Sequence, residues 1–474
     1  MNKPARLLLL ASLVLAAAAA FLWLFRVGPA PGPDDAAFPP PAARPDDGAA
    51  ADPDGGLWPG WRGPGGSGVA LEPPDADIPF ESARTIWKAE AGAGGNGSPV
   101  VWGGRVFLAG ADASATSLRR AVVMAFDHAT GRPAWRAEVP APGRPAKPPS
   151  VNNGWATPTP ACNGRRLVAV FADGTMACLG LNGALAWTHD LGPIDHLWGL
   201  AASPAIDDRR AYVAVDQGKE SSAPSFVTAV DLDTGAPAWR TEIAQSGGRG
   251  YSTPVLLRGD GAAALVLWAG DRLTAFDAQT GRPLWQAPTF AELEPVATLL
   301  PAGDLLVLTQ SDRASAWRVR GAGPAAPETA WTLFTEAGAR FARIAASVAY
   351  RGRLYGVSEA GAAVCHDAGT GRPLWTGKLG GTFFAASVAA GGRVIFTRRD
   401  GALHVLKAGD RFERAGTLAP GGRTDASPAV AGGRLYVRTR REDGGTVLWC
   451  LSAGKTNHGD TERTETIRDE GNRR

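Results

Sequence analysis

The sequence predicts an all-β protein built as an eight-bladed β-propeller, and three observations lead there: a repeated closing phrase, the short strands between its copies, and the number of opening phrases. The closing phrase is Thr-Gly-x-x-x-Trp, and its clearest copies end at Trp135, Trp239, Trp285 and Trp375. Tryptophans 44 to 52 residues apart continue this series from Trp87 onward. A repeat of that length is typical of solenoids, arrays and propellers.

Each repeat contains four short apolar runs. In the repeat that ends at Trp285, runs at 255–257, 264–268 and 273–276 are bounded by Gly or Asp, and a fourth begins at Leu284. None is long enough for a helix with an apolar stripe every 3.6 residues. Four short strands make one propeller blade, and the Gly of the closing phrase can adopt the positive φ that a tight hairpin turn needs.

Eight Ser/Thr openings, most of them followed by Pro, set the number of blades. They are Ser98, Thr157, Ser203, Thr253, Thr298, Ser347, Ser387 and Ser427. The last blade, 429–451, has only three strands. The segment around Trp87 has a closing Trp and no strands before it, so we expect this N-terminal strand to complete the eighth blade and close a ring over residues 84–452. A closed ring leaves no long exposed sheet edge.

The N-terminus carries an export signal of some kind. Residues 7–25 form an apolar run of membrane-spanning length that follows Lys3 and Arg6. Residues 1–26 are therefore a transmembrane signal anchor or a cleaved signal peptide, and the preceding basic residues place the ring outside the cytoplasm. We expect a single anchor in the bacterial inner membrane with the propeller on the periplasmic side.

Three further segments flank the predicted ring. Residues 27–56 are rich in Pro, Ala and Asp and are expected to form a disordered linker. Residues 57–83 are a preamble that we expect to lie outside the ring. Residues 453–474 are charged and nearly free of apolar side chains, which predicts a disordered tail. The whole chain has a net charge of only +3 and no run of basic residues, so no nucleic-acid partner is expected.

The repeats resemble the pyrroloquinoline-quinone-like (PQQ-like) propeller family. The most specific stretch runs from Phe171-Ala172-Asp173-Gly174 to Ser203-Pro204, and the preamble Trp58-Pro59-Gly60-Trp61 looks like the segment before the ring in exported bacterial members. The family includes quinoprotein dehydrogenases and the outer-membrane assembly propeller (BamB). The resemblance therefore implies the fold more firmly than the function.

A quinoprotein dehydrogenase would need carboxylate and amide oxygens for a calcium ion beside PQQ. The residues two before each opening sample the surface where that cofactor would lie. Among the eight, only Asn96 and Asp425 supply such oxygens; the others are Trp155, Ala201, Tyr251, Val296, Ala345 and Ala385. The chain also has no adjacent pair of cysteines, which the family's alcohol dehydrogenases place against PQQ. We expect no cofactor, with PQQ and calcium as the alternative.

Asn153, Trp155, Trp198 and Tyr251 are the candidate binding residues, because they cluster in the segments that connect blades two to four. Exposed aromatic side chains on a rigid ring are suited to partner binding; the other interpretation is that they plug the mouth of the channel. The sequence favours a non-enzymatic binding or assembly scaffold in the cell envelope, with a protein or an envelope polymer as partner. The alternatives are a quinoprotein oxidoreductase with a degenerate site and a carbohydrate- or polymer-binding envelope module.

Overall fold

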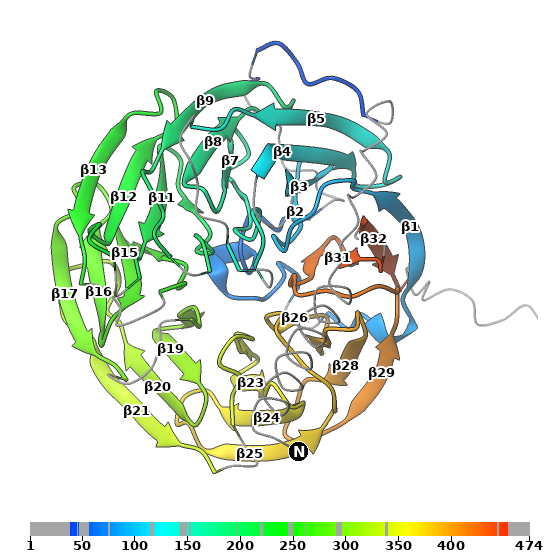
Figure 1. Ribbon diagram of the computed structural model, residues 1–474. Helices are drawn as coiled ribbons and strands as arrows, with labels where there is room; N and C mark the ends of the chain where they lie inside the picture. The colour runs from blue at the N-terminus through cyan, green and yellow to red at the C-terminus, as the bar shows by residue number, and fades with distance from the viewer. Residues whose placement is uncertain are drawn as a thin grey trace, which may run out of the picture.

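The computed structural model describes residues 38–44, 46, 56–73, 76–113, 118–142, 149–150, 153–196, 198–218, 221–244, 250–259, 261–290, 296–336, 340–442 and 445–453. Within these ranges, eight four-stranded sheets stand around a common axis and form an eight-bladed β-propeller (Figure 1). The predicted fold class is confirmed. The apolar segment 7–25 and residues 454–474 lie outside the described residues. Among the residues that are described, no helix has the length and apolar character needed to cross a membrane.

In seven blades the strands follow chain order from the inner to the outer strand (Figure 1). Blade 1 contains β2 (Val100–Trp102), β3 (Arg105–Ala113), β4 (Leu118–Asp127) and β5 (Pro133–Val139). Blade 2 contains β6 (Ala161–Cys162), β7 (Leu167–Val170), β8 (Thr175–Leu179) and β9 (Leu185–Asp190). Blade 3 contains β10 (Ala205–Ile206), β11 (Arg210–Val215), β12 (Phe226–Asp231) and β13 (Pro237–Glu242). Blade 4 contains β14 (Val255–Gly259), β15 (Ala262–Ala269), β16 (Arg272–Asp277) and β17 (Pro283–Pro288).

The remaining blades repeat this order. Blade 5 contains β18 (Leu300–Ala302), β19 (Leu305–Gln310), β20 (Arg313–Arg318) and β21 (Glu328–Phe334). Blade 6 contains β22 (Val348–Tyr350), β23 (Arg353–Val357), β24 (Ala362–Asp367) and β25 (Pro373–Lys378). Blade 7 contains β26 (Val388–Ala390), β27 (Arg393–Thr397), β28 (Leu403–Lys407) and β29 (Arg414–Leu418). Blade 8 contains β30 (Ala429–Ala431), β31 (Arg434–Arg440), β32 (Thr446–Ser452) and the N-terminal strand β1 (Arg84–Glu90).

Closure of the ring by the N-terminal strand is confirmed. Strand β1 pairs antiparallel with β32, and Lys88 lies opposite Trp449 in this pairing. The order β1-β32-β31-β30 places β1 at the outside of blade 8. The pairing leaves β32 without a free edge, as a ring requires.

The closing tryptophan of one blade docks on the turn of the next. Trp87 of blade 8 donates its indole N–H to the carbonyl oxygen of His128 at 3.0 Å, and its ring covers Gly131. Gly131 has a φ of 72°, and a Cβ there would lie only 2.5 Å from the Trp87 ring. The same indole bond recurs at Trp135–Leu181, Trp187–Leu232, Trp239–Ala278, Trp331–Ala368 and Trp375–Gly409. In each closing phrase, the Gly therefore contacts the Trp of the preceding blade, and the Trp contacts the Gly turn of the following blade.

Part of the predicted linker lies on the ring, beside β5 and β9 (dark blue in Figure 1). Phe38 contacts Phe126 edge to face at 5.4 Å, and the Asp46 carboxylate accepts the N–H of Leu181 at 3.0 Å. In blade 1 the corresponding turn is held by its own Asp127, which accepts the N–H of Thr130. The turn of blade 2 has no such Asp, so Asp46 supplies the missing carboxylate.

The first part of the preamble, up to Ala70, fills the central channel, so the expectation that the preamble lies outside the ring is wrong; its second part, with the 3-10 turn η3 (Phe80–Ser82), lies against blade 7. Trp58 is 1% exposed and exchanges two backbone hydrogen bonds with Val101 of blade 1. Pro59 accepts a bond from blade 2, and Ala70 donates one to Ala389 of blade 7. The short 3-10 turn η2 (Pro64–Gly66) contacts the inner strands of blades 4 and 5 and lies near the centre of Figure 1. Eight short inner strands leave a channel that their own side chains do not fill, and this segment occupies it.

The channel segment, residues 56–70, is anchored by a buried arginine. Arg62 is 1% exposed and donates to the carbonyl oxygens of Gly66, Ser67 and Ser347, the last of these in blade 6. Burial lowers the pKa of Arg62 to about 9. Gly56 lies against Gly432, in the turn between the first two strands of blade 8. The segment therefore enters the channel from the end of the ring where those turns lie.

Replacing Trp135 by Phe tests the docking bond, with Trp285→Phe as its matched control. Both side chains are buried, at 4% and 6% exposure, but of the two only Trp135 donates an indole hydrogen bond within the described residues, to Leu181 at 2.9 Å. We expect Trp135→Phe to lower the free energy of unfolding by about 1 kcal/mol more than Trp285→Phe, the net value of one hydrogen bond. Denaturant midpoints measure this. Equal shifts for the two variants would contradict it.

Candidate binding face

Hydroxyl groups tie the starts of neighbouring inner strands together at one end of the ring. The N–H of Ser98 donates to Thr159 Oγ1 at 2.9 Å, that of Thr159 to Ser203 Oγ at 3.0 Å, and that of Ser203 to Thr253 Oγ1 at 3.0 Å. The N–H of Ser427 completes the series by donating to Ser98 Oγ at 3.1 Å. These bonds run from blade 8 to blade 4. They fix the segments that connect each outer strand to the next inner strand, which we call the hand-over segments.

The opening of blade 2 is Thr159-Pro160, one dipeptide later than the predicted Thr157-Pro158. Thr157 instead donates its hydroxyl to the carbonyl oxygen of Asn153. The two consecutive Thr-Pro steps are indistinguishable in the sequence, and only the bond to Ser203 identifies Thr159 as the opening. Trp155 consequently does not occupy the position at which it was expected.

A series of hydrogen bonds crosses the hand-over segments of blades 8 to 3. Arg440 at the end of β31 donates to Asn96 Oδ1 at 2.9 Å. The Asn96 side-chain amide donates to the carbonyl oxygen of Asn153 at 2.9 Å, and the Asn153 amide donates to that of Trp198 at 3.1 Å. Side chains thus connect three successive hand-over segments.

His196 extends this series toward blade 4. Its Nδ1 accepts the backbone N–H of Trp198 at 3.2 Å and lies 2.9 Å from the Tyr251 hydroxyl. An Nδ1 that accepts an N–H bears no proton, so the Tyr251 hydroxyl donates to it. The two rings meet edge to face with centroids 4.7 Å apart, and His196 is 2% exposed. The whole series, from Arg440 to Tyr251, forms what we call the hand-over chain.

The structure brings together three of the four predicted binding residues. Asn153 and Trp198 are directly bonded, Tyr251 joins them through His196, and all three are half-buried. Trp155 is different: it is 5% exposed and belongs to the core between blades 1 and 2, so the expectation of an exposed aromatic there is wrong. Because blade 2 opens at Thr159 rather than at Thr157, Trp155 lies inside the interface between blades 1 and 2. The sequence analysis did not identify His196 as a member of the hand-over chain.

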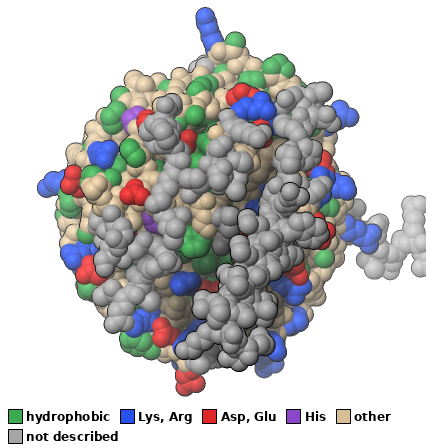
Figure 2. All heavy atoms as spheres, in the orientation of Figure 1, with side chains coloured by type: hydrophobic (Ala, Val, Ile, Leu, Met, Phe, Trp, Pro, Cys, Tyr) green, Lys and Arg blue, Asp and Glu red, His purple; other side chains and the backbone are tan. Residues whose placement is uncertain are grey.

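The other side of this end of the ring is rich in arginine. Both carboxylate oxygens of Asp425 accept bonds from Arg399. Arg438 is 2% exposed and donates to the carbonyl oxygens of Ala93, Gly97 and Ala109. Burial lowers the pKa of Arg438 to about 9, and the charge of Arg440 adds to that shift. On the face drawn in Figure 2, side chains of both charges are scattered around the rim.

A family model described as "Outer membrane protein assembly factor BamB" matches residues 78–321 and 315–455, which is well over half of the sequence. The chain belongs to this family of PQQ-like propellers. A comparison with curated proteins finds no match.

Solved structures share the fold of this BamB-like chain at low sequence identity. BamB from Moraxella catarrhalis is 17% identical with a TM-score of 0.57, covering 79% of this chain and 99% of its own. A europium-containing methanol dehydrogenase is 11% identical with a TM-score of 0.63, covering 84% and 98%. The quinohemoprotein alcohol dehydrogenase from Comamonas testosteroni is 12% identical with a TM-score of 0.63, covering 88% and 82%. Membership of the BamB-like propeller family supports a role for this chain as a binding or assembly scaffold.

The two oxygen ligands sampled at the hand-over end, Asn96 and Asp425, are poorly suited to a calcium ion beside PQQ. Calcium takes six to eight oxygen ligands, whereas Asn96 Oδ1 already accepts from Arg440 and the Asp425 carboxylate from Arg399. These guanidinium groups would also repel a divalent cation. In the described parts of this BamB-like chain, His, Cys, Asp and Glu side chains nowhere gather in groups of three that could hold a metal.

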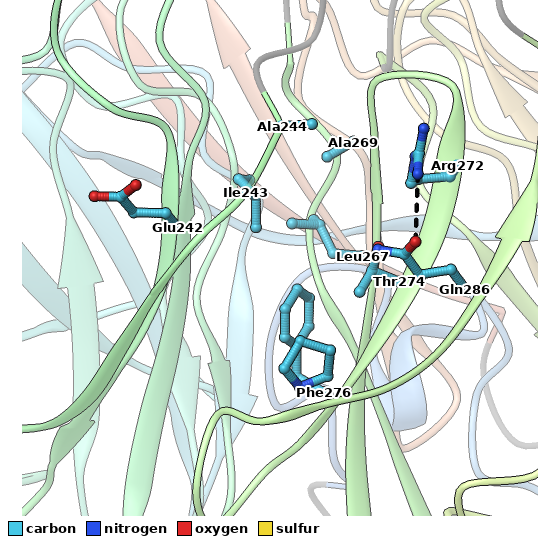
Figure 3. Close-up of a pocket in the computed structure, with 10 residues that line it drawn as sticks. Glu242, Ile243, Ala244, Leu267, Ala269, Arg272, Thr274, Phe276 and Gln286 are labelled. Carbon is cyan, nitrogen blue, oxygen red and sulfur yellow. Dashed lines mark hydrogen bonds between the residues drawn. The ribbon is translucent and has the colours of Figure 1, made fainter.

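A cavity of about 110 Å³ lies between blades 3 and 4, and Ile243 and Ala244 of the hand-over segment between these blades line part of it (Figure 3). Leu267 and Phe276 form part of its apolar lining, and the Glu242 carboxylate points away from the other labelled side chains. The Arg272 guanidinium, which also lines the cavity, donates hydrogen bonds to Asp271 and, at 3.3 Å, to Gln286. The one cation in the lining is therefore already paired.

We expect no quinone to bind when the purified chain is incubated with PQQ and calcium chloride. The reason is that Asn96 and Asp425 are engaged by arginines and cannot complete a calcium shell. Absorbance after gel filtration measures this, with an authentic quinoprotein apoenzyme treated in parallel as the control. A stoichiometric quinone band that elutes with the protein would contradict this interpretation of the site.

Proposed function

We propose that this protein is a non-enzymatic, membrane-tethered propeller that acts as a binding or assembly scaffold on the extracytoplasmic side of the bacterial inner membrane. Its binding face is the hand-over end of the ring, along the hand-over chain from Arg440 to Tyr251. The proposal depends on the hand-over chain, because these hydrogen bonds hold polar and aromatic side chains from successive hand-over segments in one arrangement.

The rigidity of the hand-over chain supports binding rather than catalysis. Side chains already held by hydrogen bonds lose little conformational freedom when a partner binds. Asn153, Trp198 and Tyr251 supply amide, aromatic and hydroxyl groups, which suit contact with a protein surface. Trp58 and Arg62 fill the channel at the axis, so a ligand would dock on the end of the ring rather than pass through it.

The sequence and the family support the envelope location. The apolar segment 7–25 follows basic residues, as in an exported protein with an N-terminal anchor. The description of the matching family refers to outer-membrane protein assembly. A partner that is a protein, or an envelope polymer, would meet the ring in the periplasm.

The double variant Trp198→Ala, Tyr251→Ala tests the binding face. In cells treated with a crosslinker that cannot cross the inner membrane, we expect this variant to lose its crosslinked partners about tenfold or more, as loss of a binding hot spot implies. Its melting temperature should stay within about 2 °C of the parent, since the core between the blades is intact. Mass spectrometry of carbonate-washed membranes identifies the partners.

The control is Ile86→Ala, Phe334→Ala, which removes two apolar side chains that are 52% and 71% exposed on the outer strands β1 and β21. It should keep every partner. If the double variant melts early, or keeps all partners, its residues serve packing. If the parent protein itself is not crosslinked, the extracytoplasmic location is wrong.

A further inference from the structure

The hand-over end at blades 7 and 8 carries more positive than negative charge. Four arginines, Arg399, Arg423, Arg438 and Arg440, lie around the carboxylate of Asp425, while the neighbouring carboxylates of Asp400 and Glu90 are paired with Arg398 and Arg441. Their charges interact: the pKa of Arg440 is lowered by desolvation and by Arg423 and Arg399, with only Asp425 opposing the shift. We call these four side chains the arginine cluster.

Arg423 and Arg440 are cross-strand neighbours. They exchange two backbone hydrogen bonds, from Arg423 N to Arg440 O at 2.8 Å and from Arg440 N to Arg423 O at 2.6 Å. Residues directly opposite in an antiparallel pair project to the same side, and like charges in that arrangement are destabilising. Arg423 is exposed, and within the described part of the chain its side chain makes no hydrogen bond or ion pair. An anion between the two guanidinium groups would relieve their repulsion.

Arg438 adds a buried charge to the same side. It lies two residues before Arg440 on β31, and side chains two apart on a strand share a face. It is 2% exposed and bonded only to carbonyl oxygens, and its Nε has no partner among the described residues. The cluster therefore contains a desolvated cation with no carboxylate of its own.

The cluster already binds one carboxylate in the geometry that a peptide would use. Arg399 donates to both oxygens of Asp425, and its guanidinium lies 4.0 Å above the centre of the Phe384 ring. A planar guanidinium matches a carboxylate in this forked arrangement. The pair is recessed, with the Arg399 and Asp425 side chains 19% and 14% exposed. A flat membrane surface would not reach this depth, whereas an extended chain would.

We propose that the arginine cluster binds the side-chain carboxylates of an extended acidic segment of a protein partner. This assignment rests on the proposed function, since the cluster belongs to the same end of the ring and joins the hand-over chain through the bond from Arg440 to Asn96. It adds a chemical class to the partner: a polypeptide rich in Asp and Glu.

The test uses the full-length chain in detergent and a fluorescein-labelled peptide of about ten glutamates, with binding followed by anisotropy. In Arg423→Gln, Arg440→Gln we expect the Kd to rise about tenfold or more relative to the parent. The matched control is Arg258→Gln, Arg411→Gln, which removes the same charge from exposed arginines that make no side-chain bond in the described residues. It should change the Kd less than twofold. Arg423→Gln alone should show a smaller loss and leaves the bond to Asn96 in place.

Three results would overturn the assignment. Equal losses in the test and control pairs would mean that net charge alone attracts the peptide, and an unchanged Kd in the test pair would mean that the cluster does not bind it. Binding of phosphatidylglycerol vesicles that depends on Arg423 and Arg440, without peptide binding, would assign the cluster to anionic lipid. Crosslinking of the Trp198→Ala, Tyr251→Ala variant tests the proposed function separately. If that variant keeps all its partners while peptide binding still depends on Arg423 and Arg440, the proposed function fails. If it loses its partners while the peptide does not bind the cluster, the assignment of the arginine cluster fails.

Discussion

The indole of one blade docked on the glycine turn of the next is the contact on which the ring depends. Each blade buries its faces only against its neighbours, so the order of the blades is set by contacts such as that of Trp87 with Gly131 and the carbonyl oxygen of His128. Gly131 serves two purposes, because its positive φ makes the turn and its missing Cβ leaves room for the ring. With the blades held in register, their hand-over segments come together at one end, where the bonds to the Ser and Thr hydroxyl groups and the hand-over chain connect them.

The two ends of the ring differ because the N-terminal segments contact the end opposite the hand-over segments. The part of the N-terminal linker that contains Asp46 lies on the turn of blade 2, and the channel segment with Trp58 and Arg62 enters beside the turn of blade 8. The hand-over end presents instead a series of bonded side chains, aromatic toward blades 3 and 4 and guanidinium-rich toward blades 7 and 8. A scaffold that binds through this end needs no open channel, which accords with the filled axis.

The repeats could be predicted from the sequence because each blade encodes its own strands, turn Gly and closing Trp within about fifty residues. Closure by β1 followed from the unpaired Trp87 phrase. The preamble could not be placed, since Trp58 is buried by inner strands far away in the chain and no local pattern records that. Trp155 was misplaced because two consecutive Thr-Pro steps fit one opening. Asn153, Trp198 and Tyr251 were found from their positions, but the role of His196 between them depends on side-chain geometry.

The channel segment, residues 56–70, fills the axis of the ring and so leaves its hand-over end as the surface for binding. Hydrogen exchange of the full-length chain, read by mass spectrometry, tests it most directly. Backbone amides in the channel segment bond to Val101 of blade 1 and to Ala389 of blade 7, so peptides covering residues 56–70 should exchange as slowly as those of the inner strands. Exchange of this segment at the rate of an unprotected chain, with the blades still protected, would contradict the account.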